Sequence, residues 1–193
     1  KEIQYSDLIA LASSRSKGST IDYGENKSVV VGDLAEYDFS DTDIAIFSPG
    51  AKISSEFAPK AAKQGCIVID NTSHFRTDPE VPLVVAEVNP EALKNFRTKN
   101  IISNPNCSTM GMLVAVKPLH DQFTIKRIVV STYQSVSGAG KEAADELFNQ
   151  TKSIYSNEAV VKEKFTKQIA FNVIPHIDVF LEDGQTKEEW KMY

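Results

Sequence analysis

One cysteine stands where a nucleophile could work. Cys107 follows Asn106, a residue type that commonly caps helices, and lies two residues after Pro105, a type favoured at helix N-termini, in the run SNPNCSTMGML. Backbone N–H groups and the helix dipole at such an end stabilise a thiolate. The same N–H groups can hold the oxyanion that forms when the thiolate attacks a carbonyl. The sequence therefore predicts Cys107 as a nucleophile.

The other candidate thiol and imidazoles point to structural roles. Cys66 begins the apolar run CIVID and is expected to be a small buried hydrophobe. Two cysteines without a CxxC pair, with only three histidines, predict neither a zinc site nor a disulfide framework. We expect His120 to pair with a helix C-terminus and His176, after a strand-like run, to be structural.

Composition restricts the classes of partner. The 193 residues carry a net charge of −5, with 41% hydrophobic and 24% charged residues, which is typical of a soluble domain. The basic residues are scattered, so we expect no nucleic-acid partner. No apolar run approaches the roughly 18 residues of a membrane span. The N-terminal run KEIQYSDLIA lacks the regions of a signal peptide, and we expect a cytoplasmic protein without a membrane partner.

The elements that must position the cysteine begin with four strand-like runs in the first seventy residues. These runs are DLIALASS, SVVVGDL, DIAIFSPG and GCIVIDN. Their nearly continuous apolar character predicts strands buried on both faces of a parallel sheet. A helix is expected between the last two, capped by Ser54 or Ser55 and ended by Gly65. The predicted fold is α/β, a Rossmann-like doubly wound parallel sheet whose ligands bind at the carboxyl ends of the strands.

The segment after the first run concerns the cofactor. An acid at the end of the second strand of such a sheet binds the ribose 2′-OH of NAD, whereas an arginine accommodates the 2′-phosphate of NADP. Here the candidates are Ser13, Arg15 and Ser16, with no acid, although a solvated turn explains the same residues equally well. No Gly-rich loop precedes this run, so we expect the first strand and its phosphate loop to be absent from the chain.

The second half of the chain has a different pattern. TIKRIVVSTYQSVSG alternates like a long strand, AGKEAADELFNQTKSIY reads as an amphipathic helix, and the tail holds a strand-like run, a turn at EDGQ and the start of a helix. We therefore predict a partial nucleotide-binding domain over residues 1–104 and an incomplete α+β catalytic and dimerisation domain over residues 105–193.

Five segments together resemble one family. SNPNCSTM, STYQSVSGAGKEA, FSPGAKISSEFAPKAA, DNTSHFRTDPEVPLVVAEVN and FNVIPHID are similar to aspartate-β-semialdehyde dehydrogenase of the bacterial type. The resemblance implies reversible NADP-dependent reduction of β-aspartyl phosphate to aspartate semialdehyde with release of phosphate. That step leads to lysine, threonine, methionine and isoleucine. It also implies a homodimer or a homotetramer built as a pair of dimers.

The resemblance also assigns roles to residues. Cys107 would form the thioacyl intermediate, and Gln134 of TYQ would orient the substrate and the catalytic imidazole. Glu188 would hold the substrate amino group. The phosphate ligands implied are Arg76, Asn106 and Lys191. The NADP ligands implied are Ser13, Arg15, Ser16, Ser48, Gly50, Ser137 and Gly138.

Two features depart from the family pattern. Family members carry an N-terminal Gly-rich loop and a later arginine and histidine, and neither segment occurs in this sequence. We therefore expect the chain to be part of a longer polypeptide and to be inactive by itself. His74 stands where a small residue is expected.

Other readings stay open at this point. N-acetylglutamyl phosphate reductase and phosphorylating glyceraldehyde-3-phosphate dehydrogenase use the same thioester chemistry. Cys107 with His176 would be a papain-like pair, but the local cysteine motif of that class is absent. A noncatalytic oligomerising paralogue or fragment is a further alternative. Outside the family context, Arg76, Glu188 and Lys191 would be ordinary surface ion-pair residues.

Overall fold

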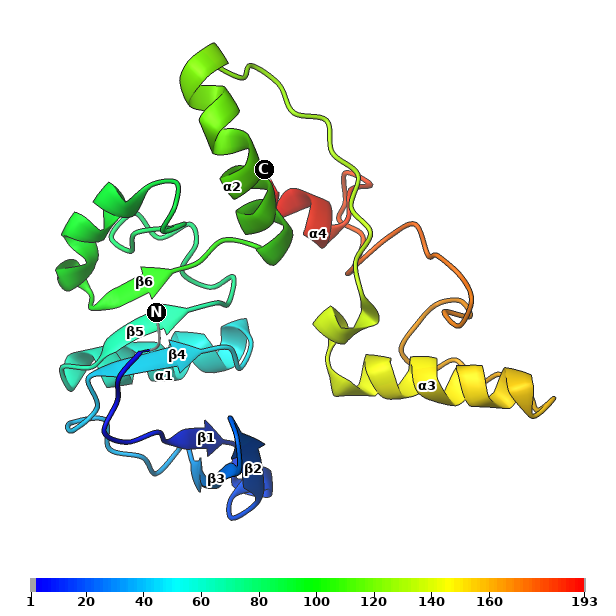
Figure 1. The fold of residues 1–193 in the computed structure, drawn as a ribbon, viewed down its shortest axis with the longest axis horizontal. Helices are drawn as coiled ribbons and strands as arrows, with labels where there is room; N and C mark the ends of the chain where they lie inside the picture. Colours follow the sequence, from blue (N-terminus) through cyan, green and yellow to red (C-terminus); the bar gives the residue numbers. More distant parts are fainter. Residues whose placement is uncertain (1–2, 193) are drawn as a thin grey trace. The chain divides into compact units, whose positions relative to one another are not determined.

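The chain consists of two compact units. A computed structural model describes residues 3–192 (Figure 1). The first unit ends at Val114 and the second begins at Ala115, so the division falls inside helix α2, Cys107–Phe123. The proposed domain start at residue 105 stays a prediction.

The central sheet of the first unit is parallel. It contains β4 (Ile44–Phe47), β5 (Ile67–Asp70) and β6 (Ile101–Ser103) in the order β4-β5-β6. Phe47 pairs with Asp70, and Asp70 pairs with Ser103. The three arrows therefore point the same way in Figure 1, and the three strands end side by side. The short strand β6 was not expected from the sequence.

Helix α1, Ala51–Lys63, connects β4 to β5. It begins directly after Gly50, whose φ of 92° is a conformation that L side chains rarely adopt, so the expected caps Ser54 and Ser55 are wrong. Ser54 lies within α1 and is fully buried, because small side chains on this face let the helix approach the sheet closely. Pro59 also lies inside α1, and Gly65, with a φ of 98°, ends the helical segment as predicted.

A hydrophobic core joins α1 to this sheet. Its buried members are Phe39, Phe47, Ala58, Ala61, Ala62, Cys66, Val68, Phe75, Val81 and Ile101. The opposite face of β4 is open, because Ile44 and Ile46 are 55% and 71% exposed. The expectation that these strands are covered on both faces is therefore wrong for β4, since no described segment packs on that face.

A second, mixed sheet precedes the parallel one. It contains β1 (Ala10–Ala12), β2 (Thr20–Tyr23) and β3 (Lys27–Asp33), with β1 parallel and β2 antiparallel to β3. In a dinucleotide-binding sheet of order 3-2-1-4-5-6, β1 and β3 correspond to strands 2 and 3, and β4, β5 and β6 correspond to strands 4, 5 and 6. None of the described strands corresponds to strand 1, which lies between strands 2 and 4 in that order, and the described strands accordingly form two sheets. The α/β class with parallel pairing is confirmed, and the β2 hairpin is an addition.

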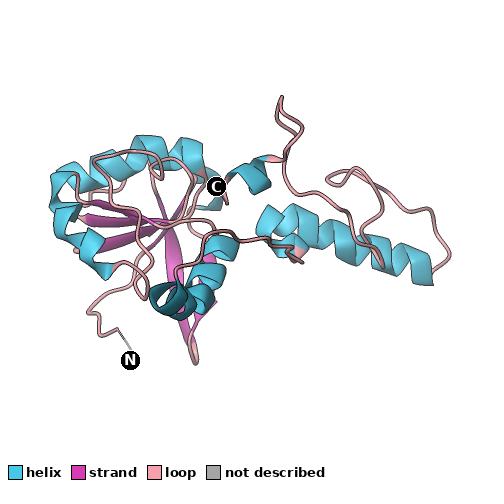
Figure 2. Cartoon of the chain, turned by 90° about the horizontal axis from the view of Figure 1, so that it is seen from above, coloured by secondary structure: helices cyan, strands magenta, loops and turns pink. Residues whose placement is uncertain are grey.

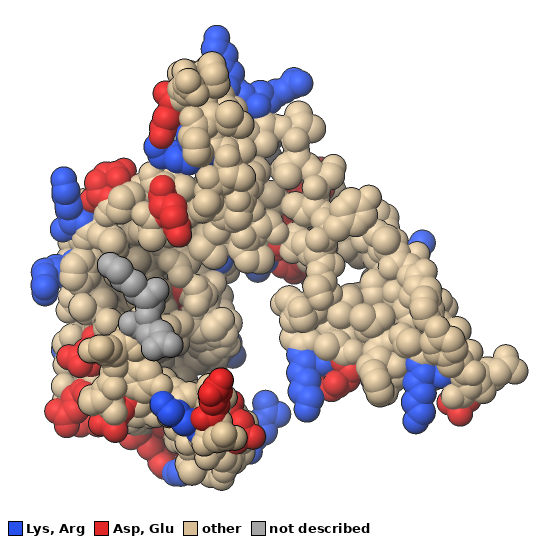
Figure 3. Space-filling view, viewed as in Figure 1, with Lys and Arg blue, Asp and Glu red and all other residues tan. Residues whose placement is uncertain are grey.

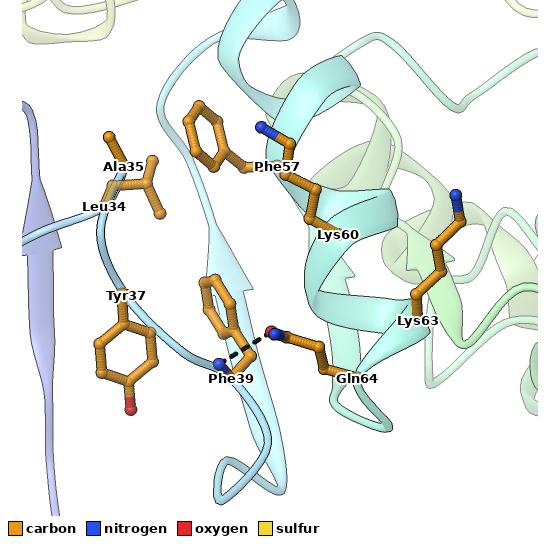
Figure 4. Close-up of a pocket in the computed structure, with 8 residues that line it drawn as sticks. All are labelled: Leu34, Ala35, Tyr37, Phe39, Phe57, Lys60, Lys63 and Gln64. Atoms are coloured by element: carbon orange, nitrogen blue, oxygen red, sulfur yellow. Dashed lines mark hydrogen bonds between the residues drawn. The ribbon is translucent and has the colours of Figure 1, made fainter.

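A shallow cleft of about 290 Å³ lies beside α1. Figure 4 shows aromatic and aliphatic side chains on its walls, with lysines at the rim. Its lining residues are Leu34, Ala35, Tyr37, Phe39, Phe57, Lys60, Lys63 and Gln64. The Gln64 side-chain oxygen accepts a 2.9 Å hydrogen bond from the backbone N–H of Phe39, which ties the end of α1 to the segment entering β4. No residue predicted for the site lines this cleft.

The second unit is built around α3, Lys141–Tyr155, preceded by the 3-10 turn η3, Val136–Ala139. Buried Gln150 accepts hydrogen bonds from the N–H groups of Ile169 and Ala170 at 2.9 and 3.1 Å. Buried Glu146 accepts one from the N–H of Glu163 at 3.2 Å. Figure 2 shows the resulting arrangement, a helix followed by long loops. The chain after α3 is therefore held by side chains of the helix.

Two strands expected in this unit do not form. Residues 124–135 have no regular structure, and Val129 and Tyr133 are 83% and 87% exposed. The expected strand in the tail is reduced to one isolated bridge between Phe180 and Thr186 around a turn, followed by α4, Lys187–Trp190. Alternating sequence needs a neighbouring strand to satisfy its backbone groups, and no described segment pairs with residues 124–135.

Two further surface features bear on function. Lysine, arginine, aspartate and glutamate side chains are interspersed on the face in Figure 3, without a continuous basic stripe on that face. Among the described residues, no helix combines the length and hydrophobicity needed to cross a bilayer. The remaining helical segments are η1 (Ser14–Ser16) and η2 (Pro90–Thr98).

Candidate active site

Three loops meet where β4, β5 and β6 end. The N–H of Asn71 donates to the carbonyl of Phe47 at 2.9 Å, and the N–H of Asn104 donates to the carbonyl of Asp70 at 2.9 Å. These bonds continue the sheet ladder one residue beyond the strands. They keep Asn71 and Asn104, the first residues of the loops after β5 and β6, in register with the strand ends beside Ser48. The carboxyl edge is the expected ligand-binding edge of such a sheet.

The loop after β5 is shaped by a buried carboxylate. Asp70 is fully buried, and its two oxygens accept hydrogen bonds from the backbone N–H and the hydroxyl of Thr72 at 3.0 and 2.9 Å. The Thr72 hydroxyl oxygen also accepts the N–H of His74 at 3.3 Å. Local polar contacts therefore turn the chain immediately after the strand. His74 is accommodated with its ring edge-on to Phe75, at 4.6 Å between ring centroids.

Arg76 connects this loop to the cysteine segment. Its Nε donates a 2.9 Å hydrogen bond to the carbonyl of Asn104, and its Nη2 donates a 3.0 Å bond to the carbonyl of Asn71. The side chains of Asn104 and Asn71 also contact each other, with Nδ2 of Asn104 2.6 Å from Oδ1 of Asn71. The guanidinium is thus held by two loops rather than projecting freely, which differs from an ordinary surface arginine.

Cys107 lies at the first position of α2 and is exposed. Asn106 is 6% exposed, and its side-chain oxygen accepts hydrogen bonds from the N–H groups of Ser108 and Thr109 at 2.9 and 3.3 Å. The predicted cap and the predicted helix start are therefore confirmed. Cys66, in contrast, is fully buried, and burial raises the pKa of its thiol, with a smaller contribution from the charge of Asp43. The burial of Cys66 matches its structural interpretation.

The cofactor candidates of the first unit follow two strands. Ser48 and Gly50 are exposed between β4 and α1, and a Cβ at Gly50 would have no atom within 4 Å. That open backbone at the start of a thirteen-residue helix suits the approach of a phosphate. Ser13, Arg15 and Ser16 are exposed at η1, directly after β1. Both groups therefore follow carboxyl ends of strands.

The second unit holds the other candidates. Gln134 is half-buried and donates from Nε2 to the hydroxyl of Thr132 at 3.1 Å. Ser137 and Gly138 lie in the exposed turn η3, where the hydroxyl oxygen of Ser135 accepts the N–H of Ser137 at 3.4 Å. These three candidates belong to one short segment that leads into α3.

Glu188 and Lys191 form an ion pair of 3.1 Å and therefore share one face of the α4 turn, as their spacing predicts. Their side chains are only 12% and 18% exposed, so they are not a solvated helix face. Asp178, which the sequence reasoning did not single out, lies 3.0 Å from the Lys191 ammonium. The helix itself is started by a reciprocal cap between Thr186 and Glu189.

Of the predicted site residues, the first unit contains Ser13, Arg15, Ser16, Ser48, Gly50, Arg76, Asn106 and Cys107. The second unit contains Gln134, Ser137, Gly138, Glu188 and Lys191. Asn71 and Asn104 were missed from the sequence. Each stands directly after a strand, in IDN and ISN, and that position was the available signal.

Two of the histidines, His120 and His176, lie outside the loops that follow β4, β5 and β6. His120 lies in the last turn of α2, as expected. The ring of His176 packs 5.0 Å from that of Phe180, in a segment without a strand. Among residues 3–192, no group of three or more histidine, cysteine, aspartate or glutamate side chains could hold a metal ion.

Two models of one family cover most of the chain. Residues 2–96 match "Semialdehyde dehydrogenase, NAD binding domain", and residues 116–193 match "Semialdehyde dehydrogenase, dimerisation domain". The chain belongs to the semialdehyde dehydrogenase family. Within this family, it is 55% identical over 185 residues to an aspartate-semialdehyde dehydrogenase of Shewanella sp. strain DB6705, covering 96% of this chain and 54% of the relative.

Other semialdehyde dehydrogenases agree with this assignment. The chain is 53% identical over its whole length to aspartate-semialdehyde dehydrogenase 2 of Vibrio cholerae, of which it covers 57%. A crystal structure of aspartate semialdehyde dehydrogenase II from Vibrio cholerae, complexed with ASA, superposes with a TM-score of 0.92 at 53% identity. That match covers 96% of this chain and 55% of the other. The chain thus spans about half the length of the curated relatives it matches.

Proposed function

We propose that this chain is part of an NADP-dependent aspartate-semialdehyde dehydrogenase, which reversibly converts β-aspartyl phosphate to aspartate semialdehyde in the biosynthesis of lysine, threonine, methionine and isoleucine. The observation that carries the proposal is the exposed thiol of Cys107 at the start of α2, with the Arg76 guanidinium fixed to the segment that enters the same helix. A nucleophile and a bidentate anion-binding group are thus supplied by adjoining strand ends.

The proposed chemistry begins at Cys107. Its thiolate attacks the carbonyl carbon of the acyl phosphate, a C–S bond forms, and the C–O bond to phosphate breaks, so inorganic phosphate leaves with the electron pair. Backbone N–H groups at the helix start stabilise the intermediate oxyanion. In the first unit, Arg76 and Asn106 are the proposed ligands of the phosphoryl group. In the second unit, the family resemblance implies Lys191 as a further phosphate ligand and Glu188 as the ligand of the substrate amino group. It implies Gln134 as the residue that orients the substrate and the catalytic imidazole. In the reverse direction, phosphate attacks the thioacyl group on Cys107.

The described residues supply part of the proposed binding site for a nicotinamide dinucleotide. When bound, the reduced cofactor supplies the hydride that converts the thioacyl group to the aldehyde. Ser48 and the open backbone of Gly50 suit its phosphates at the start of α1. Arg15, with Ser13 and Ser16 in the same turn, suits a 2′-phosphate better than a free ribose hydroxyl, which supports NADP over NAD. Ser137 and Gly138 are the candidates from the second unit.

The second unit supports an assembly proposal. It matches a dimerisation domain of the family. We propose that the protein assembles as a homodimer, or as a homotetramer of two dimers, through residues of this unit.

The decisive experiment compares wild type and Cys107→Ser in the full-length protein. Phosphate-dependent formation of NADPH from aspartate semialdehyde should be lost in the variant, because a serine hydroxyl is a far poorer nucleophile than a thiolate at a helix terminus. Cys66→Ser is the matched control and should keep the reaction. Near-normal turnover by Cys107→Ser would refute the proposal. A wild type that oxidised N-acetylglutamate semialdehyde instead would move the assignment to the related reductase.

A further inference from the structure

A side-chain contact between two asparagines crosses the edge where β5 and β6 end. Nδ2 of Asn104 donates a 2.6 Å hydrogen bond to Oδ1 of Asn71. The same two residues present the backbone carbonyls that accept Nε and Nη2 of Arg76 at 2.9 and 3.0 Å. Both amides therefore link the two loops that hold the guanidinium.

The backbone on either side of this contact is already fixed. The N–H of Asn71 is bonded to the carbonyl of Phe47, and that of Asn104 to the carbonyl of Asp70. Two residues beyond Asn104, buried Asn106 caps α2. The separation of the Asn71 and Asn104 carbonyls consequently determines how the plane of the Arg76 guanidinium is oriented relative to the start of the helix.

We infer that Asn71 and Asn104 form a clamp that positions Arg76 beside Cys107 and so sets the affinity of the site for inorganic phosphate. The inference rests on the proposed function, in which Arg76 binds the phosphoryl group. The clamp residues touch no reacting atom in this role. They are positioning residues, and their side chains can be changed while the backbone bonds of Asn71 and Asn104 remain.

The test is a pair of mutant cycles in the full-length enzyme, with KM for phosphate and kcat measured separately. Asn71→Ala and Asn104→Ala should each raise KM for phosphate about twofold to tenfold, the range of a single net hydrogen bond. The double variant should be no worse than either single one, because both remove the same contact. Asn172→Ala, which removes a 2.8 Å bond from Nδ2 to the carbonyl of Gln168 within the second unit, is the control and should leave KM for phosphate unchanged.

A second cycle guards against misfolding by testing the Asn104 substitution in a background that keeps the contact and in one that lacks it. Asn71→Asp has nearly the same shape and still accepts the Asn104 amide, so adding Asn104→Ala in this background should again raise KM for phosphate. In the Asn71→Ala background the same addition should cost nothing. Additive losses in both backgrounds, or lower thermal stability with unchanged KM for phosphate, would overturn the clamp. The proposed function is tested separately, by whether the full-length enzyme requires Cys107 and phosphate for turnover.

Discussion

Nε of Arg76 lies 2.9 Å from the backbone carbonyl of Asn104, three residues before Cys107 in the chain. A residue contributed by the loop after β5 is therefore attached to the segment that leads from β6 into α2. This contact shows that Arg76 holds the two loops together, and the anion binding that we propose for Arg76 is a second, separable task.

Replacement of Arg76 should separate these tasks. In the full-length enzyme, Arg76→Lys keeps the charge but loses the two-pronged geometry, so KM for phosphate should rise while NADP binding stays close to normal. Arg76→Ala should lower kcat/KM for phosphate about tenfold to a hundredfold, since a hydrogen bond to a charged group contributes roughly 1.5 to 3 kcal/mol. Steady-state kinetics with varied phosphate measure this. Arg97→Ala, an exposed arginine of η2, is the control. Unchanged phosphate dependence in Arg76→Ala would make the residue purely structural.

Charge reversal at Arg15 should discriminate between the two nicotinamide cofactors. Arg15→Glu puts a carboxylate where the 2′-phosphate of NADP is proposed to lie, so NADP affinity should fall much more than NAD affinity. Titration of the full-length protein with each cofactor measures the ratio. Lys27→Glu, on strand β3, matches the change in net charge. Equal losses for both cofactors would show that Arg15 is an ordinary surface residue.

Removing the cap of α2 should affect both stability and the thiol. Asn106→Ala deletes the oxygen that accepts the N–H groups of Ser108 and Thr109 and should destabilise the protein by about 1 kcal/mol. Asn106→Ser keeps a capping oxygen and should recover most of that loss. Chemical denaturation measures stability, and the rate of Cys107 alkylation by iodoacetamide measures the thiol. If Ala and Ser variants were equally unstable, the cap would not explain the role of Asn106.

The ion pair of Lys191 and Asp178 should make the stability of the second unit depend on pH. Burial alone would raise the pKa of Asp178, but hydrogen bonds from Lys191 and the N–H of Val179 outweigh it and hold that pKa below its usual 3.8. Burial alone would lower the pKa of Lys191, but hydrogen bonds to Asp178 and Glu188 hold it above 10.5. The pair therefore makes its full contribution to the stability of the fold between pH 3.8 and pH 10.5, the usual pKa values of the two groups. Its contribution is lost as pH falls through the folded-state pKa of Asp178, or rises through that of Lys191.

Asp178→Asn tests this dependence. The variant should be about 1 to 2 kcal/mol less stable than wild type at pH 7, and the difference should shrink in strong acid, where the wild-type carboxylate is protonated too. Thermal unfolding across pH 2 to 8 is a suitable measurement. Lys17→Gln, which breaks the exposed pair with Glu36, should change stability little at any pH. A constant difference across the whole range would indicate that the charge of Asp178 is irrelevant.

Local patterns were sufficient for several parts of this protein. Apolar runs bounded by polar residues predicted β3, β4 and β5, because a buried strand needs such a run wherever it pairs. The start of α2 at Cys107 followed from Asn106 and Pro105, because a cap bonds to N–H groups only two or three residues away. The family motifs were likewise readable in order along the chain.

Contacts between distant residues were decided by the tertiary structure alone. The Asn71 and Asn104 side chains meet across 33 positions because parallel pairing of β5 with β6 brings the strand ends together, and no local pattern encodes that register. The alternating run at residues 124–135 predicted a strand, yet a strand forms only where another segment completes its backbone hydrogen bonds, and none of the described residues does so. Local sequence determined the start of α2 and the apolar runs of β3, β4 and β5, and pairing between strands decided which residues at their ends lie together.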